Sequence, residues 1–171
     1  MTSPTFTAVK ALIVDDSSHM RALLRAMLQS FGMLNFYEAM DGESGFAALL
    51  DCKPDLVITD LSMQGTDGIE FTRKIRRSRQ SPNPIVPILM VTGHTQRPRI
   101  EAARDAGVTE FLAKPFTAQQ LLERLTRIVD RPRQFVRCEC YTGPDRRRRK
   151  RDSQTGPWRR LDDVEQLWEI E

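Results

Sequence analysis

The stretch ALIVDD, residues 11–16, decides the fold, because four apolar residues are followed at once by two carboxylates. Three more short apolar runs end in a similar way: LVIT precedes Asp60, ILMV precedes Thr92, and FLA precedes Lys114. Runs of this length, rich in Val, Ile and Leu and alternating with helical patterns, are typical of parallel strands buried on both faces. The sequence therefore predicts an α/β protein built on a doubly wound parallel sheet.

Residues 1–130 contain five strand-helix repeats of this kind. Strands are expected near residues 9–14, 35–39, 55–59, 86–91 and 109–113, and helices near 18–31, 43–51, 67–78, 97–106 and 117–129. Ser17 or Ser18 is expected to cap the first helix, and Gly32 to end it. Thr117 opens the last helix, with a glutamine three residues later. Right-handed crossovers then place the ends of the first and third strands at the switch point of the five-stranded sheet.

The polar residues that follow these strands form a candidate site. Ligands of such sheets bind at the carboxyl ends of the strands, so these side chains should converge there. Asp15, Asp16 and Asp60 would repel one another unless a divalent cation and a transferred phosphoryl group shared the site. Lys114 and Thr92 would meet the phosphoryl oxygens with a positive charge and a hydroxyl group. The combination predicts a phosphoryl-transfer site.

These motifs resemble the receiver domain of two-component response regulators, and most closely the single-domain chemotaxis regulators, over roughly residues 9–130. The resemblance implies a flavodoxin-like fold in which a histidine kinase phosphorylates Asp60, with Thr92 as the switch hydroxyl and Lys114 as the partner of the phosphoryl group. The implied Mg2+ ligands are Asp15, Asp16, Asp60 and the Ser62 backbone carbonyl. Such a site phosphorylates and dephosphorylates itself, so the protein is not expected to turn over a substrate as an enzyme does.

Two positions depart from the family pattern, although Asp67, Gly68 and Phe116 match it. Gln64 replaces the proline usual after the phosphoacceptor, which should loosen that loop. Phe111 replaces the tyrosine often found at the aromatic switch, and its ring has no hydroxyl group to offer a partner.

Residues 131–171 differ in character from the receiver part. Residues 1–130 carry 15 basic and 15 acidic side chains, so the net charge of +3 comes from the last 41 residues, which include ten arginines. The block RRRRKR at 146–151 repels itself and predicts a partly disordered arm. The sequence thus predicts a receiver domain at 1–130 and an arginine-rich extension at 131–171. Turns are expected at 142–145 and 155–158, and a short helix at 161–170.

The extension is suited to an anionic, planar ligand, because arginine binds phosphate through two hydrogen bonds and stacks on flat bases. It resembles the extension of CheY-like effectors of alphaproteobacteria, which implies cyclic di-GMP binding and contact with a flagellar motor switch protein. The implied ligand residues are Arg146, Arg147, Arg148, Arg149, Arg151, Asp152, Trp158, Arg159 and Arg160. The same charge also suits an acidic protein partner, a passive arm or, less favoured, nucleic acid, whose binding would depend steeply on salt. The receiver part alone would suffice for a phosphate sink or relay intermediate.

Targeting signals are not evident in the chain. No apolar stretch approaches the ~20 residues of a membrane helix, and residues 1–10 lack the form of a signal peptide. The sequence therefore predicts a cytoplasmic protein without a membrane span.

Overall fold

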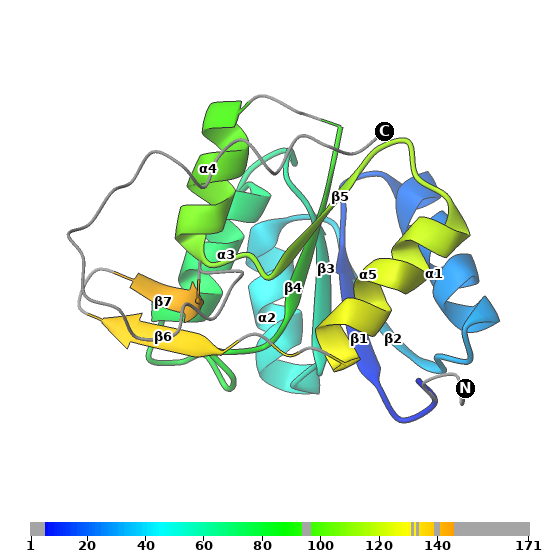
Figure 1. The fold of residues 1–171 in the computed structure, drawn as a ribbon, viewed down its shortest axis with the longest axis horizontal. Helices are drawn as coiled ribbons and strands as arrows, with labels where there is room; N and C mark the ends of the chain where they lie inside the picture. Colours follow the sequence, from blue (N-terminus) through cyan, green and yellow to red (C-terminus); the bar gives the residue numbers. More distant parts are fainter. Residues whose placement is uncertain (1–5, 94–96, 131, 133, 139–140, 146–171) are drawn as a thin grey trace, which may run out of the picture.

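The computed structural model describes residues 6–93, 97–130, 132, 134–138 and 141–145. Its central sheet has five parallel strands in the order β2-β1-β3-β4-β5 (Figure 1). The strands are β1 (Lys10–Val14), β2 (Asn35–Ala39), β3 (Leu56–Asp60), β4 (Ile88–Thr92) and β5 (Glu110–Ala113). The strand order reverses between β1 and β3, which confirms the predicted doubly wound, flavodoxin-like sheet.

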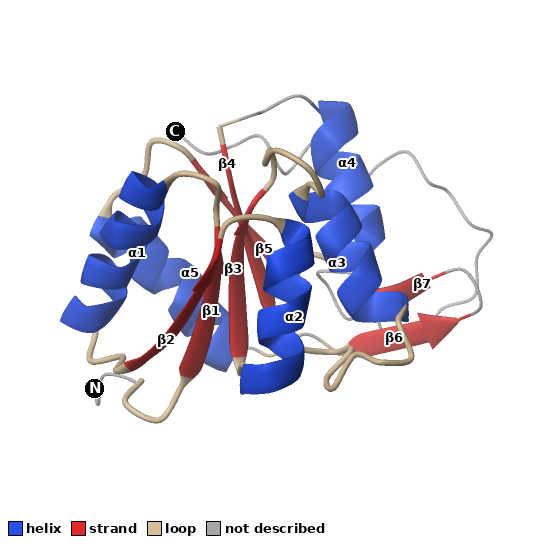
Figure 2. Ribbon diagram, turned by 180° about the vertical axis from the view of Figure 1, so that it is seen from behind, coloured by secondary structure: helices blue, strands red, loops and turns tan. Residues whose placement is uncertain are grey.

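Five helices cover the two faces of this sheet. They are α1 (Ser18–Ser30), α2 (Gly42–Cys52), α3 (Gly68–Arg77), α4 (Arg97–Ala106) and α5 (Ala118–Asp130). Helices α1 and α5 lie on one face, and α2, α3 and α4 lie on the other (Figure 2). The bounds of these helices and of the five strands lie within two residues of those expected. None of the helices in the described ranges is long and apolar enough to cross a membrane.

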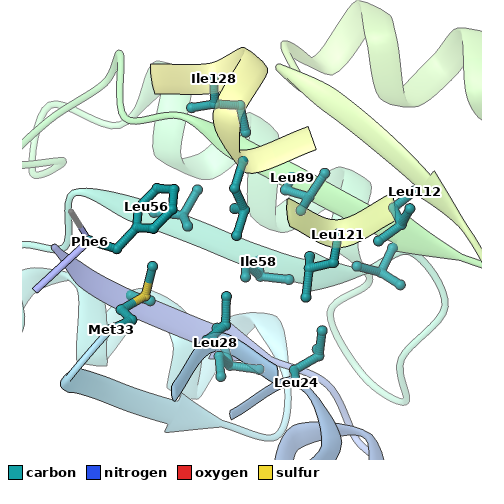
Figure 3. Packing of buried hydrophobic residues seen from close by; sticks show 14 residues of the cluster. Phe6, Leu24, Leu28, Met33, Leu56, Ile58, Leu89, Leu112, Leu121 and Ile128 are labelled. Atoms are coloured by element: carbon teal, nitrogen blue, oxygen red, sulfur yellow. The ribbon is translucent and has the colours of Figure 1, made fainter. Parts of the chain in front are cut away.

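Strands β1, β3 and β4 are mostly apolar because their side chains alternate between two cores, whereas the edge strand β2 is largely exposed. Ile58 points into the cluster beneath α1 and α5, which includes Leu24 and Leu121 (Figure 3). Ile13 of β1 belongs to the same cluster. On the opposite face, the cluster of Leu12, Val14, Val57, Phe46, Phe71 and Ile75 packs beneath α2 and α3. A strand buried on both sides has no polar face, which is why the sequence showed continuous apolar runs.

The helix ends follow the expected local chemistry. Ser17 caps α1, and its Oγ accepts a hydrogen bond from the Met20 backbone N–H at 3.3 Å. Thr117 and Gln120 form the reciprocal pair at the start of α5, with N···O distances of 3.2 and 2.9 Å. Gly32 follows α1 with φ of +88°, a conformation that glycine adopts without strain.

The extension contains two strands that the sequence did not predict. Strand β6 (Phe135–Cys138) pairs antiparallel with β7 (Tyr141–Pro144). The prediction of a turn at 142–145 is therefore wrong, because residues 142–144 belong to β7. Pro144 is tolerated there because it lies at the end of a two-stranded ribbon, where a missing backbone N–H costs little. Figure 1 shows the hairpin beside the carboxyl-terminal ends of α3 and α4.

The hairpin covers Arg76, a buried residue of α3 with 3% of its surface exposed. The Arg76 Nε donates to the Gly107 carbonyl at 3.0 Å, and Nη1 donates to the Pro84 carbonyl at 2.8 Å. The guanidinium carbon lies 5.0 Å from the centre of the Phe135 ring. A Cβ atom on Gly143 would lie 2.8 Å from the Cα of Gly107, the residue after α4, so only glycine allows β7 to approach this closely. The first part of the extension is thus packed on the receiver.

Residues 146–171 lie outside the described residues. They include all nine residues predicted to bind cyclic di-GMP, the turn expected at 155–158 and the helix expected at 161–170.

Candidate functional site

Three of the predicted side chains meet at the carboxyl edge of the sheet. Asp15 follows β1, Asp60 ends β3 and Lys114 follows β5. The Lys114 Nζ lies 3.0 Å from Asp60 Oδ1 and 3.4 Å from Asp15 Oδ2. Asp15 and Asp60 are buried, with 2% and 9% of their surfaces exposed. The expectation that these residues converge is confirmed.

The remaining predicted residues border this centre. Thr92 ends β4, is buried, and accepts a hydrogen bond on its backbone carbonyl from the Lys114 N–H at 2.8 Å. Asp16 is exposed, and its Oδ2 lies 3.4 Å from the Gln64 backbone nitrogen, which donates to it. Ser62 is half-buried, two residues after Asp60. Gln64 is exposed, in the loop that connects β3 to α3.

Gly68 explains why the pair at residues 67–68 belongs to this site. A Cβ atom on Gly68 would collide with the Asp60 backbone carbonyl oxygen, so the start of α3 packs directly on the end of β3. Asp67 caps α3, and its Oδ1 accepts from the backbone N–H groups of Ile69 and Glu70 at 3.0 and 2.9 Å. Together these two residues fix α3 against the backbone of Asp60.

The site carries more negative than positive charge. Burial raises the pKa of Asp15, and the neighbouring Asp60 charge adds to this shift. The Ser17 backbone N–H, 2.8 Å from Asp15 Oδ1, and the Lys114 charge oppose it. One lysine thus serves two buried carboxylates with a third nearby. Such an excess of carboxylate charge favours a divalent cation.

The donor atoms of this site fit Mg2+, which prefers hard oxygen ligands. In the parts of the chain that the structure describes, no three His, Cys, Asp or Glu side chains form a ready-made metal cage. Mg2+ does not need one, because it keeps several water ligands that can complete its coordination. The groups that would hold it are the carboxylates of Asp15, Asp16 and Asp60 and the Ser62 backbone carbonyl.

Two aromatic residues flank the site on opposite faces of the sheet. Phe111 on β5 is half-buried and packs against the apolar cluster that includes Met90 and Ala103, on the α4 side. Phe116 packs against the cluster beneath α1 and α5. The Lys114–Pro115 peptide bond is cis.

Two arginines near the site were missed by the sequence analysis. Arg21 on α1 donates from Nη1 to the Asp15 backbone carbonyl at 2.7 Å. Arg99 on α4 pairs with Asp67 Oδ2 at 3.2 Å. Neither contact could be found from sequence, because an arginine on a helix surface is usually solvated and its partner here comes from another element.

A doubly wound sheet whose carboxyl edge joins two buried carboxylates to a lysine defines the receiver class of signalling domains. The model of the response regulator receiver domain family matches residues 11–126. The chain belongs to this family.

Known proteins similar to this chain include chemotaxis regulators. Chemotaxis protein CheY of Pseudomonas aeruginosa is 38% identical over 123 residues, which cover 72% of this chain and 98% of that protein. CheY-3 of Vibrio cholerae is also 38% identical, with 72% of this chain and 93% of that protein covered. The solved structure of V. cholerae CheY4 matches with a TM-score of 0.64 and 32% identity, over 70% of this chain and 98% of that one. The protein is thus a CheY-like response regulator of two-component signalling.

Proposed function

We propose that a histidine kinase phosphorylates this protein on Asp60 and that the phosphorylated receiver acts by contact with a partner protein. The observation that carries the proposal is the position of Lys114, whose Nζ lies within 3.4 Å of both Asp60 and Asp15. A cation held there stabilises charge that develops on a transferred phosphoryl group.

Asp60 is better suited than Asp15 to act as the nucleophile. Asp15 accepts hydrogen bonds on both carboxylate oxygens, from the Ser17 N–H and from Lys114. Asp60 accepts from Lys114 on Oδ1, and within the described ranges its Oδ2 has no hydrogen-bond partner. The Oδ2 lone pairs of Asp60 are therefore available for attack.

In the transfer step, an Asp60 carboxylate oxygen attacks the phosphorus of a phosphohistidine. A new P–O bond forms, the P–N bond breaks, and the imidazole leaves with the electron pair. Lys114 then pairs with a phosphoryl oxygen, and the Thr92 hydroxyl donates to another. Bound Mg2+ would neutralise charge on the carboxylates and on the phosphoryl oxygens. Water attacks the same acyl phosphate later, so the protein dephosphorylates itself and turns over no separate substrate.

The switch residues Thr92 and Phe111 would carry the signal to the surface of α4, β4 and β5. Thr92 ends β4, and Phe111 packs on the cluster beneath α4, so a shift of either side chain alters the support of α4. We propose that the protein is cytoplasmic and that its partner is a flagellar motor switch protein, because the relatives are chemotaxis proteins. A phosphate sink or relay intermediate is the alternative.

Backbone amide shifts with and without beryllofluoride, a phosphoryl mimic, test this output. We expect changes over α4 and β5 in the wild type and none in Asp60→Asn. Changes confined to the loops around Asp60 would support the sink instead.

We also propose that the extension binds cyclic di-GMP. Its composition supports this, since ten of its residues are arginines, and Asp152 and Trp158 lie among them. Arginine clamps phosphate or the guanine O6 and N7 atoms, a carboxylate accepts from guanine N1-H and N2-H, and tryptophan stacks on the base. The hairpin ends at Pro144 against α4, so the described part of the extension ends beside the receiver.

Calorimetry on the full chain tests the cyclic di-GMP site. Arg147→Ala, Arg149→Ala and Arg160→Ala should each weaken binding by about 1.5–3 kcal/mol, as expected for charge-assisted hydrogen bonds. Arg137→Ala is the matched control, because this exposed arginine belongs to β6 and lies outside the basic block. If single-stranded DNA competed as well as cyclic di-GMP, and the binding of both weakened steeply with salt, the extension would instead be a nucleic-acid-binding arm.

A further inference from the structure

We propose that Arg21 is a positioning residue that, together with Glu38, orients the Asp15–Asp16 peptide for Mg2+ binding. The inference rests on the proposed function only in assigning Mg2+ to these carboxylates. It concerns residues of α1 and β2 to which the motif analysis gave no role.

Arg21 joins three elements of the fold through two hydrogen bonds. Its Nη1 donates to the Asp15 backbone carbonyl at 2.7 Å, at the end of β1. Its Nε donates to Glu38 Oε2 on β2 at 3.1 Å. Because the side chain of Arg21 is only 19% exposed, these contacts are screened less by solvent than ordinary surface ion pairs. The planar guanidinium reaches the two acceptors from two separate nitrogens, Nε and Nη1, whereas a lysine would have to reach both from a single nitrogen.

The Asp15 carbonyl oxygen belongs to the peptide group that connects Asp15 to Asp16, so its position affects both acidic residues. Peptide planarity means that fixing this oxygen also fixes the direction of the Asp16 N–H and the start of the Asp16 backbone. The Asp15 side chain has its own support from Ser17 and Lys114. Asp16 is exposed, and the contact of its carboxylate with Gln64 is long, at 3.4 Å. Orientation of Asp16 therefore depends on its backbone more than on its side-chain contacts.

The ion pairs of Glu38 bear on whether Arg21 affects Mg2+ binding through the orientation of the peptide or through its positive charge. Glu38 pairs with Arg21 on Oε2 and with Arg25 on Oε1, the latter at 3.0 Å. The ion pair with Glu38 offsets part of the Arg21 charge, since Glu38 is shared with Arg25. A purely electrostatic effect would have the opposite sign, because an unpaired cation near the carboxylates repels Mg2+. The two effects are therefore separable by experiment.

The test is a Mg2+ titration of the full chain followed by backbone amide shifts, without any phosphodonor. In Arg21→Met the Mg2+ dissociation constant should rise about threefold to tenfold, at or below the lower end of the loss seen when groups that orient metal ligands are removed. Arg21→Lys should give a dissociation constant between those of the wild type and Arg21→Met, because a single nitrogen cannot occupy the separate positions of Nε and Nη1. Arg25→Met is the matched control and should bind Mg2+ like the wild type, since Arg25 contacts Glu38 but not the Asp15 carbonyl.

A second readout separates positioning from a general loss of structure. In phosphorylation by a small phosphodonor, Arg21→Met should raise the half-saturating Mg2+ concentration by the same factor as the dissociation constant. At saturating Mg2+ most of the phosphorylation rate should be recovered. In metal-free Glu38→Gln, hydrogen exchange at the Asp16 amide should be faster than in the wild type. Unchanged or tighter Mg2+ binding by folded Arg21→Met would overturn the inference, as would an equal loss in Arg25→Met. A wild type that binds Mg2+ but accepts no phosphoryl group would refute the proposed function and leave the role of Arg21 standing.

Discussion

Replacement of Phe135 by alanine tests whether the hairpin is part of the folded receiver. The Phe135 ring is half-buried and lies 5.0 Å from the Arg76 guanidinium. Such a cation–π contact contributes about 0.5–2 kcal/mol, depending on its desolvation. Full burial of a phenylalanine is worth about 3–5 kcal/mol against alanine, and this ring is only partly buried. We therefore expect Phe135→Ala to lower the free energy of unfolding by about 1.5–3 kcal/mol.

A double-mutant cycle isolates the contact between the ring and the guanidinium. Burial lowers the pKa of Arg76 to about 9, so this side chain remains charged at neutral pH and needs its hydrogen bonds and the ring for compensation. Urea unfolding would be measured for the wild type, Phe135→Ala, Arg76→Met and the double mutant. We expect a coupling energy of about 0.5–2 kcal/mol, the size of the cation–π contact.

Val136→Ala is the control variant for this cycle. It changes the next residue of β6, which is 42% exposed, and should alter stability by no more than about 0.5 kcal/mol. If Phe135→Ala had the same small effect as Val136→Ala, the docked hairpin would be wrong. If the effects of Phe135→Ala and Arg76→Met on the free energy of unfolding were strictly additive, the proposed contact between the Phe135 ring and Arg76 would also be wrong.

Three further predictions concern the receiver itself. Gly68→Ala should destabilise the fold by about 1–3 kcal/mol, because its Cβ atom would collide with the Asp60 carbonyl. Gly93→Ala is the control and should not destabilise the fold, because the space around Gly93 is open. Thermal unfolding of the two variants would test this. Asp41→Ala should cost about 1 kcal/mol at neutral pH by removing the α2 cap. The cap lowers the pKa of Asp41, so its contribution is present above the unfolded value of 3.8 and fades as pH falls through the lower folded pKa; a cost that persisted in acid would contradict this. Burial raises the pKa of Asp15, so its ionisation destabilises the fold as pH rises, and Asp15→Asn should raise the metal-free Tm at neutral pH; a lower Tm would argue against that cost.

The sheet and the buried part of the site could be predicted because both depend on local patterns and strand topology. A parallel strand buried on both faces must be apolar throughout, and its carboxyl end faces the switch point. Once the runs before Asp15, Asp60 and Lys114 are read as strands of one parallel sheet, their convergence at its carboxyl edge follows. The same chemistry located the caps at Ser17 and Thr117.

The hairpin could not be predicted because its stability depends on what it packs against. Its strands are four residues long, and a Gly-Pro pair inside β7 is typical of a turn. Its docking depends on Arg76, which the sequence does not distinguish from Arg73 or Arg77 on the same helix. Likewise, Arg21 has the appearance of a solvated helical arginine until β1 and β2 are placed beside it. Contacts between elements that are distant in sequence decide these roles.

The central claim is that Asp60 accepts the phosphoryl group. The most direct measurement is peptide mass spectrometry after the full chain has reacted with a small phosphodonor and Mg2+ and the acyl phosphate has been trapped with borohydride. We expect a single trapped site at Asp60, absent from Asp60→Asn and lost when the divalent metal is chelated. Trapping at Asp15 or Asp16 instead, or equal trapping at Asp60 without metal, would contradict it.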